Sequence, residues 1–143
     1  MTIELPESFA DIRDDFLALD EPERLQLLLE FANDLPELPE HYREHPDLLE
    51  RVEECQSPVY IFTEVDDGRV RLHATAPREA PTTRGFASIL AHGVDGLSVA
   101  QVLDLPADFP STLGLSNAVS PLRLRGMSGM LARIKRQLRE KAT

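Results

Sequence analysis

Residues 58–75 read PVYIFTEVDDGRVRLHAT and predict a β-hairpin at the centre of the fold. The first part, Pro58–Val65, is rich in β-branched and aromatic residues, which favour strands. Asp66-Asp67-Gly68 is a hairpin turn signal, because tight hairpins need residues that tolerate positive φ. From Arg69 to Thr75 apolar and polar residues alternate, as in a strand with one buried face. The sequence therefore predicts a small antiparallel sheet.

Helical patterns lie on both sides of the hairpin and predict an α+β fold. The expected helices are Pro6–Leu19, a second helix that is capped by Asp20 and ends before Pro36, Thr83–His92, Ser98–Leu103, and a last helix that begins at Ser120-Pro121. The last helix carries a buried stripe of Met127, Met130, Leu131, Ile134 and Leu138.

Local residues also predict the conformation of two connecting segments and of one helix end. Pro39–Pro46 is expected to be an acidic, irregular loop, because prolines interrupt helices. Asp47–Glu53 is expected to form either a short helical turn or an extended piece. Gly93 is expected to end its helix in the left-handed conformation.

Length and composition exclude several classes of protein. At 143 residues with 42% hydrophobic residues, the chain is expected to form a single domain, 1–143, with one core. The net charge of −10 argues against nucleic acid as a partner, and no apolar run is long enough for a membrane span. The acidic N-terminus lacks the pattern of a signal peptide, and one unpaired cysteine fits a reducing compartment, so we expect a cytoplasmic protein.

Charge is unevenly distributed along the chain. Met1–Pro121 contains eight basic and twenty-four acidic residues, whereas Leu122–Thr143 contains seven basic residues and one acidic residue. The basic last helix could complement its own dipole and the acidic remainder of the chain. Alternatively, it could form an electrostatic docking surface for a protein partner.

Cys55 is the only cysteine, so it has no partner for an intrachain disulfide and no second thiol for a metal site. It is either a small apolar residue of the core or a reactive thiol. We expect it at a loop tip before the hairpin, with its sulfur against apolar side chains. Glu53 and Glu54 flank it and should raise the pKa of its thiol, which would make it a poor nucleophile in isolation.

Three blocks of the sequence form a recognisable pattern. They are Cys55-Gln56-Ser57 with Val59 and an aromatic residue; Arg84-Gly85-Phe86; and Leu113-Gly114-Leu115-Ser116 with Ser120-Pro121-Leu122-Arg123, Gly126-Met127, Met130-Leu131 and Ile134-Lys135. Together they resemble the SufE family of sulfur-acceptor proteins in iron–sulfur cluster assembly. The chain departs from the family pattern at Glu54, where glycine is usual, and at Tyr60, where tryptophan is usual.

The resemblance implies a SufE/IscU-like fold and a role in sulfur transfer. A PLP-dependent, SufS-like cysteine desulfurase would donate sulfur to Cys55, which would pass it to a SufB-like subunit of a SufBCD-like scaffold; the chain itself would hold no cofactor. Arg123 is carried over as a partner-contact or loop-packing residue. Gln56 and Ser57 could bind the loop backbone or the terminal sulfur, and Arg84 is assigned to partner binding or loop support.

Two other functions fit the same residues. The chain could be a non-catalytic interaction domain with this fold, or a protein whose thiol senses oxidants. The four histidines are scattered and predict no zinc site, so no metal-binding residue is expected. No hydrolase, nucleotide-binding or dehydrogenase motif is present in the sequence.

Overall fold

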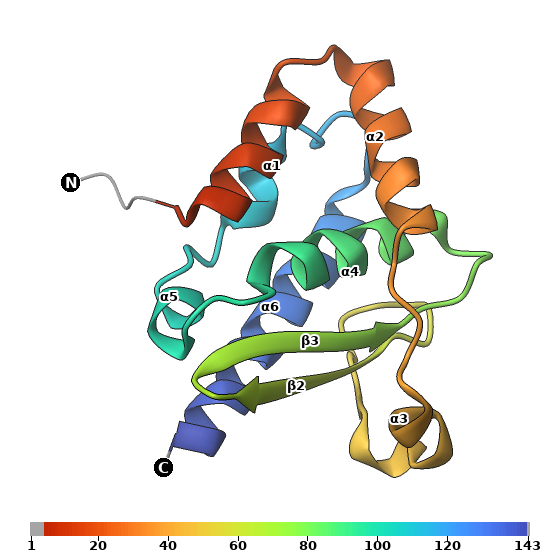
Figure 1. Ribbon diagram of the computed structural model, residues 1–143. Coiled ribbons are helices and arrows are strands. Elements are labelled where there is room, and N and C mark those ends of the chain that lie inside the picture. Colours follow the sequence, from red (N-terminus) through yellow and green to blue (C-terminus); the bar gives the residue numbers. More distant parts are fainter. Residues whose placement is uncertain (1–4, 143) are drawn as a thin grey trace.

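The computed structural model describes residues 5–142 and has the predicted α+β architecture (Figure 1). Its sheet is antiparallel, with strand order β1-β2-β3. The strands are β1 (Glu50–Arg51), β2 (Tyr60–Asp66) and β3 (Arg69–Thr75). The α-helices are α1 (Glu7–Leu17), α2 (Glu21–Asn33), α3 (Glu40–Glu44), α4 (Pro81–Val94), α5 (Val99–Leu103) and α6 (Pro121–Ala142), and the 3₁₀ helices are η1 (Pro46–Leu48) and η2 (Phe109–Leu113).

The predicted hairpin is confirmed as β2 and β3, which pair from Tyr60 opposite Thr75 to Asp66 opposite Arg69. Asp67 and Gly68 form the turn with φ angles of 52° and 76°. Two successive positive φ angles are what a two-residue hairpin turn requires, because they match the twist of the strands. Inward-facing residues of both strands are buried: Ile61, Thr63, Val70, Leu72 and Ala74.

Two long helices cover the sheet and connect it to the N-terminal helices. α4 packs against β3 and α6 packs against β2, while α1 and α2 pack on α4 (Figure 1). Every residue of the apolar stripe predicted for the last helix is buried in the core. The first half of α6 lies beside the loop that leads into β2, which is the loop that carries Cys55.

Three predicted helix caps are confirmed. Asp20 accepts a hydrogen bond from the backbone N–H of Glu23 at 3.1 Å, and Ser98 forms a capping box at the start of α5. The Ser120 hydroxyl accepts from the backbone N–H of Arg123 at 3.3 Å. Each cap satisfies a backbone donor that the first turn of a helix leaves free, so these helix starts follow from local sequence.

The expected irregular loop at Pro39–Pro46 is wrong, because α3 forms there. Tyr42 anchors this helix in the fold. Its ring lies 5.1 Å from the ring of Phe62 and 4.7 Å from that of His73, measured between centroids. Its hydroxyl donates a hydrogen bond to Glu64 at 2.8 Å. These contacts with the hairpin stabilise a helix that is too short to persist by itself.

The expected end of a helix at Gly93 is also wrong. α4 continues to Val94, and the residue with a positive φ is Gly96, at 81°. Gly93 lies inside the helix, where an added Cβ would overlap the ring of Phe9. Its lack of a side chain therefore serves the packing of α1 on α4 and not a helix cap.

Candidate functional site

The segment that leads into Cys55 adopts both conformations considered for Asp47–Glu53, since η1 and β1 follow one another. Cys55 then lies in the loop between β1 and β2, as predicted, although the two-residue strand β1 precedes it. The backbone N–H of Val52 donates to the carbonyl of Val59 at 2.9 Å and closes the base of the loop. Val52 and Val59 are both fully buried, so the two ends of the loop are fixed in the core.

The Cys55 side chain is buried against α6, with 7% of the residue exposed. A glycine makes this close approach possible, because a Cβ at Gly126 would lie 3.0 Å from the Cys55 sulfur. One turn later, a Cβ at Gly129 would lie 2.7 Å from three side-chain atoms of Glu54. The two glycines therefore create the surface of α6 on which the loop lies.

Burial raises the pKa of the Cys55 thiol to about 11. The carboxylate of Glu54 raises it further, and the guanidinium of Arg133 opposes the shift. The predicted direction is confirmed, but the main cause is loss of solvent and not the flanking charges. At neutral pH the thiol is therefore protonated and only weakly nucleophilic.

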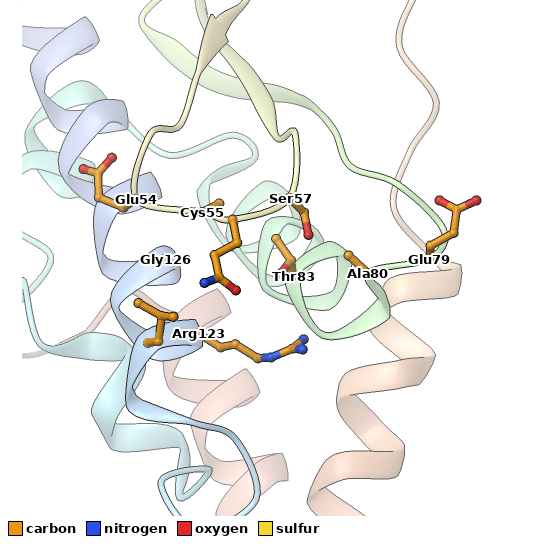
Figure 2. A pocket seen from close by; sticks show the side chains of 10 residues that line it. Glu54, Cys55, Ser57, Glu79, Ala80, Thr83, Arg123 and Gly126 are labelled. Carbon is orange, nitrogen blue, oxygen red and sulfur yellow. The ribbon is translucent and has the colours of Figure 1, made fainter.

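A pocket of about 110 Å³ opens beside Cys55 (Figure 2). Its lining comes from the Cys55 loop, from α4 and the turn before it, and from the start of α6: Glu54, Cys55, Gln56, Ser57, Glu79, Ala80, Thr83, Leu122, Arg123 and Gly126. Four of the residues singled out in the sequence thus meet in one place, namely the cysteine, its two successors and Arg123.

Arg123 extends from the first turn of α6 across the pocket, toward Thr83 and Ala80 (Figure 2). It is exposed, and its guanidinium forms no hydrogen bond or ion pair within residues 5–142. Next to it, Leu122 is 42% exposed. A cation without a partner and an apolar side chain thus flank the mouth of the thiol pocket.

Arg84 does not line this pocket. Its Nε donates to the carbonyl of Ala32 at 2.9 Å, and its Nη1 donates to the carbonyl of Ala76 at 2.8 Å. These hydrogen bonds connect the end of α2 to the segment between β3 and α4. Through these hydrogen bonds Arg84 supports the chain before α4.

Contacts between the loop and the second half of α6 were not predicted from the sequence. Arg133 binds Glu54 and Glu50 together, each at 2.7 Å. Gln137 donates to Glu50 at 2.8 Å, and its side-chain oxygen accepts from the backbone N–H and the hydroxyl of Thr63. The sequence contains one indication of these contacts, namely Gly126 and Gly129 inside the predicted last helix. Glycine disfavours a helix, so two glycines there indicate a close packing contact.

The basic residues of α6 are used in two ways. Arg133 and Arg136 form ion pairs with Glu50 of β1, and Lys141 lies 4.4 Å from the ring centroid of Phe62. This half of the helix therefore complements the acidic remainder of the chain, which is one of the two roles expected for the basic last helix. Among the described residues, only the N-terminal part of α6 places an unpaired cation, Arg123, beside the thiol.

Neither a metal site nor a membrane span was found in residues 5–142. No group of three or more histidine, cysteine or acidic residues in that range could hold a metal ion. None of the helices in the same range is long and apolar enough to cross a membrane.

Residues 10–138 match the family described as "Fe-S metabolism associated domain", SufE. An uncharacterized SufE-like protein of Mycobacterium tuberculosis is 56% identical over 137 residues, which are 95% of this chain and 94% of that protein. SufE-like protein 1, chloroplastic/mitochondrial, of Arabidopsis thaliana is 29% identical over 129 residues, which are 90% of this chain and 34% of that protein.

A solved structure has the same fold. The solution structure of a hypothetical protein from Thermus thermophilus superposes with a TM-score of 0.86 and 37% sequence identity, covering 97% of this chain and 98% of that one. The expected SufE-like α+β fold is thereby confirmed.

Proposed function

The chain belongs to the SufE family of proteins associated with Fe–S metabolism, and on that premise we propose that it is a single-domain sulfur acceptor whose acceptor group is Cys55. The observation that carries the proposal is the position of Cys55. The only thiol of the chain lies in a pocket at the surface, together with Arg123, Gln56 and Ser57. A thiol buried only for packing would need neither a pocket nor polar neighbours.

The proposed reaction is an exchange between a persulfide and a thiol. The Cys55 thiolate forms a bond to the terminal sulfur of a persulfide on a SufS-like cysteine desulfurase, whose chemistry uses PLP. The sulfur–sulfur bond of the donor breaks, and the donor cysteine leaves as a thiolate that takes up a proton. The products are a Cys55 persulfide and a donor thiol, so the step consumes no oxidant or reductant.

The raised pKa of Cys55 indicates that the thiol must be activated when the partner docks. With a pKa of about 11, roughly one molecule in ten thousand carries a thiolate at pH 7. A partner that exposes the thiol to water, or places a positive charge near it, would lower this pKa. The same property protects the free protein, because peroxide attacks thiolates. This argues against a role as an oxidant sensor.

Arg123 and Leu122 are the residues that we assign to partner contact. Both border the thiol pocket and are exposed to solvent. A guanidinium can bind a carboxylate with two parallel hydrogen bonds, so Arg123 is suited to recognise an acidic residue of the desulfurase. Gln56 and Ser57 would donate hydrogen bonds to the terminal sulfur before its transfer to a SufB-like scaffold.

Stimulation of a desulfurase tests this function. The rate of alanine formation from cysteine should rise when the wild-type chain is added to a SufS-like desulfurase, and Cys55→Ser should give no increase. Equal stimulation by both proteins would contradict sulfur acceptance. It would favour the alternative in which the fold serves only as a docking domain.

A further inference from the structure

Glu54, the residue before the thiol, is held by Arg133 on α6. The Nε of Arg133 donates to the Oε1 of Glu54 at 2.8 Å, and its Nη2 lies 2.7 Å from the same oxygen. The Nη1 of Arg133 binds Glu50 at 2.7 Å, at the start of the segment that enters the loop. One guanidinium thus fixes both the loop and the strand that leads into it.

This ion pair is coupled to the burial of Cys55 by the shape of α6. Gly126 contacts the Cys55 sulfur and Gly129 contacts the Glu54 side chain, so the two loop residues lie on adjacent turns of one helix face. Because Glu54 and Cys55 are neighbours in the chain, the thiol cannot move far from α6 while Glu54 remains bound to Arg133.

We propose that the Glu54–Arg133 ion pair is an autoinhibitory contact that holds the Cys55 loop closed on α6 and limits access to the thiol. Its biological purpose rests on the sulfur-acceptor function proposed above: a docked partner would open the loop by competing for Glu54 or Arg133. The pair suits a contact that must open, since 39% of the Glu54 side chain and 22% of that of Arg133 are exposed. Ion pairs this accessible to water are weak enough to exchange partners.

The two possible effects of Arg133 on the thiol have opposite signs, which makes the proposal testable. As a nearby positive charge, Arg133 favours the thiolate, so its removal should slow the reaction of Cys55 with an alkylating agent. As the residue that closes the loop, Arg133 limits access, so its removal should accelerate that reaction. Removal of Glu54 should accelerate alkylation through either effect, so the Glu54 variant alone cannot separate the effect of charge from the effect of loop closure.

The experiment is the rate of alkylation of Cys55 by iodoacetamide in the free protein at fixed pH and low salt. We expect Glu54→Gln and Arg133→Gln each to react about three to five times faster than wild type, because loss of a partly exposed ion pair shifts the equilibrium between closed and open loop by only a modest factor. The double variant should react no faster than the faster single variant, because one contact can be broken only once. High salt should accelerate the wild type and leave Glu54→Gln unchanged.

Two matched controls remove a charge and leave the ion pair in place. Glu53→Gln removes the other carboxylate that flanks the thiol, and Arg136→Gln removes a cation of α6 that pairs with Glu50 but not with Glu54. Both should react within about twofold of wild type. Arg133→Lys, which keeps the charge but loses the planar geometry of the guanidinium, should react faster than wild type even if Arg133→Gln fails to fold.

A rate for Arg133→Gln equal to or below that of wild type, in a protein that melts as cooperatively as wild type, would overturn the proposal. The proposal would also be overturned if Glu53→Gln accelerated alkylation as much as Glu54→Gln does. In that case the loss of any nearby negative charge would explain the acceleration, without an ion pair that closes the loop. The assay contains no desulfurase. The alkylation rates can therefore contradict the autoinhibitory contact while Cys55 still accepts sulfur. Conversely, the rates can support the contact even if Cys55 accepts no sulfur.

Discussion

Gly126 lies so close to Cys55 that a Cβ added to it would come within 3.0 Å of the sulfur. We predict that Gly126→Ala displaces the Cys55 side chain from α6 and increases its rate of alkylation. The free energy of unfolding should change by less than about 1 kcal/mol, because the higher helix propensity of alanine offsets the steric strain. Alkylation kinetics and urea unfolding measure the two effects. An unchanged rate would show that the loop can shift without exposing the thiol.

The raised pKa of Cys55 predicts the pH dependence of its reactivity. The rate of alkylation should continue to rise about tenfold per pH unit until near pH 11, because the reactive thiolate becomes more abundant over that range. A solvent-exposed thiol reaches its plateau near pH 9. A plateau at that lower pH in the wild-type protein would show that Cys55 is open to solvent in the free chain.

The same shift predicts a loss of stability at alkaline pH. In the unfolded chain the thiol ionises at its ordinary pKa of 9.0, before the folded chain can ionise it. Between pH 9 and pH 11 ionisation therefore favours the unfolded state, by at most about 3 kcal/mol, and below pH 9 this effect is absent. Cys55→Ala lacks the thiol, so its melting temperature should fall less than that of wild type over this range. Parallel curves would contradict the shift.

Arg123 should matter for sulfur transfer by more than its charge. Arg123→Ala is expected to reduce the rate of transfer from a desulfurase about tenfold, because a charge-assisted contact at the thiol pocket is lost. Arg139→Ala removes one positive charge from the distal end of the same helix and should have little effect. Transfer rates against desulfurase concentration, at low and high salt, separate the two. Equal losses in both variants would assign Arg123 to the general field of the surface.

Arg84 should contribute to stability and not to sulfur transfer. Arg84→Met leaves the carbonyls of Ala32 and Ala76 without their charged donors, which should lower the free energy of unfolding by about 1–3 kcal/mol. Urea unfolding measures this loss, and sulfur acceptance per folded molecule should equal that of wild type. A variant of normal stability that accepts sulfur poorly would instead place Arg84 in the functional site.

The elements that the sequence predicts well are those determined by neighbouring residues. The hairpin follows from Asp67-Gly68, and the starts of three helices follow from Asp20, Ser98 and Ser120. In each case the decisive contact joins residues that are close in the chain, so local rules of turn and cap chemistry are sufficient.

The features that the sequence does not predict depend on contacts between distant segments. α3 exists because Tyr42 binds Phe62 and Glu64 of β2. Likewise, the ion pair between Glu54 and Arg133 joins residues that are 79 positions apart in the chain. The residues of the pocket were predictable only in part. The family resemblance selected both Cys55 and Arg123 as functional residues, but it did not predict that α4 would contribute to the pocket lining.

The most direct test of the proposed function is the intact mass of the chain after incubation with a SufS-like desulfurase, cysteine and PLP, without reductant. We predict a gain of one sulfur atom, about 32 Da, that maps to the peptide containing Cys55 and is removed by a thiol reductant. Cys55→Ser should retain its original mass and a cooperative thermal transition. A wild-type chain that gains no mass, while the desulfurase alone carries a persulfide, would contradict sulfur acceptance by Cys55.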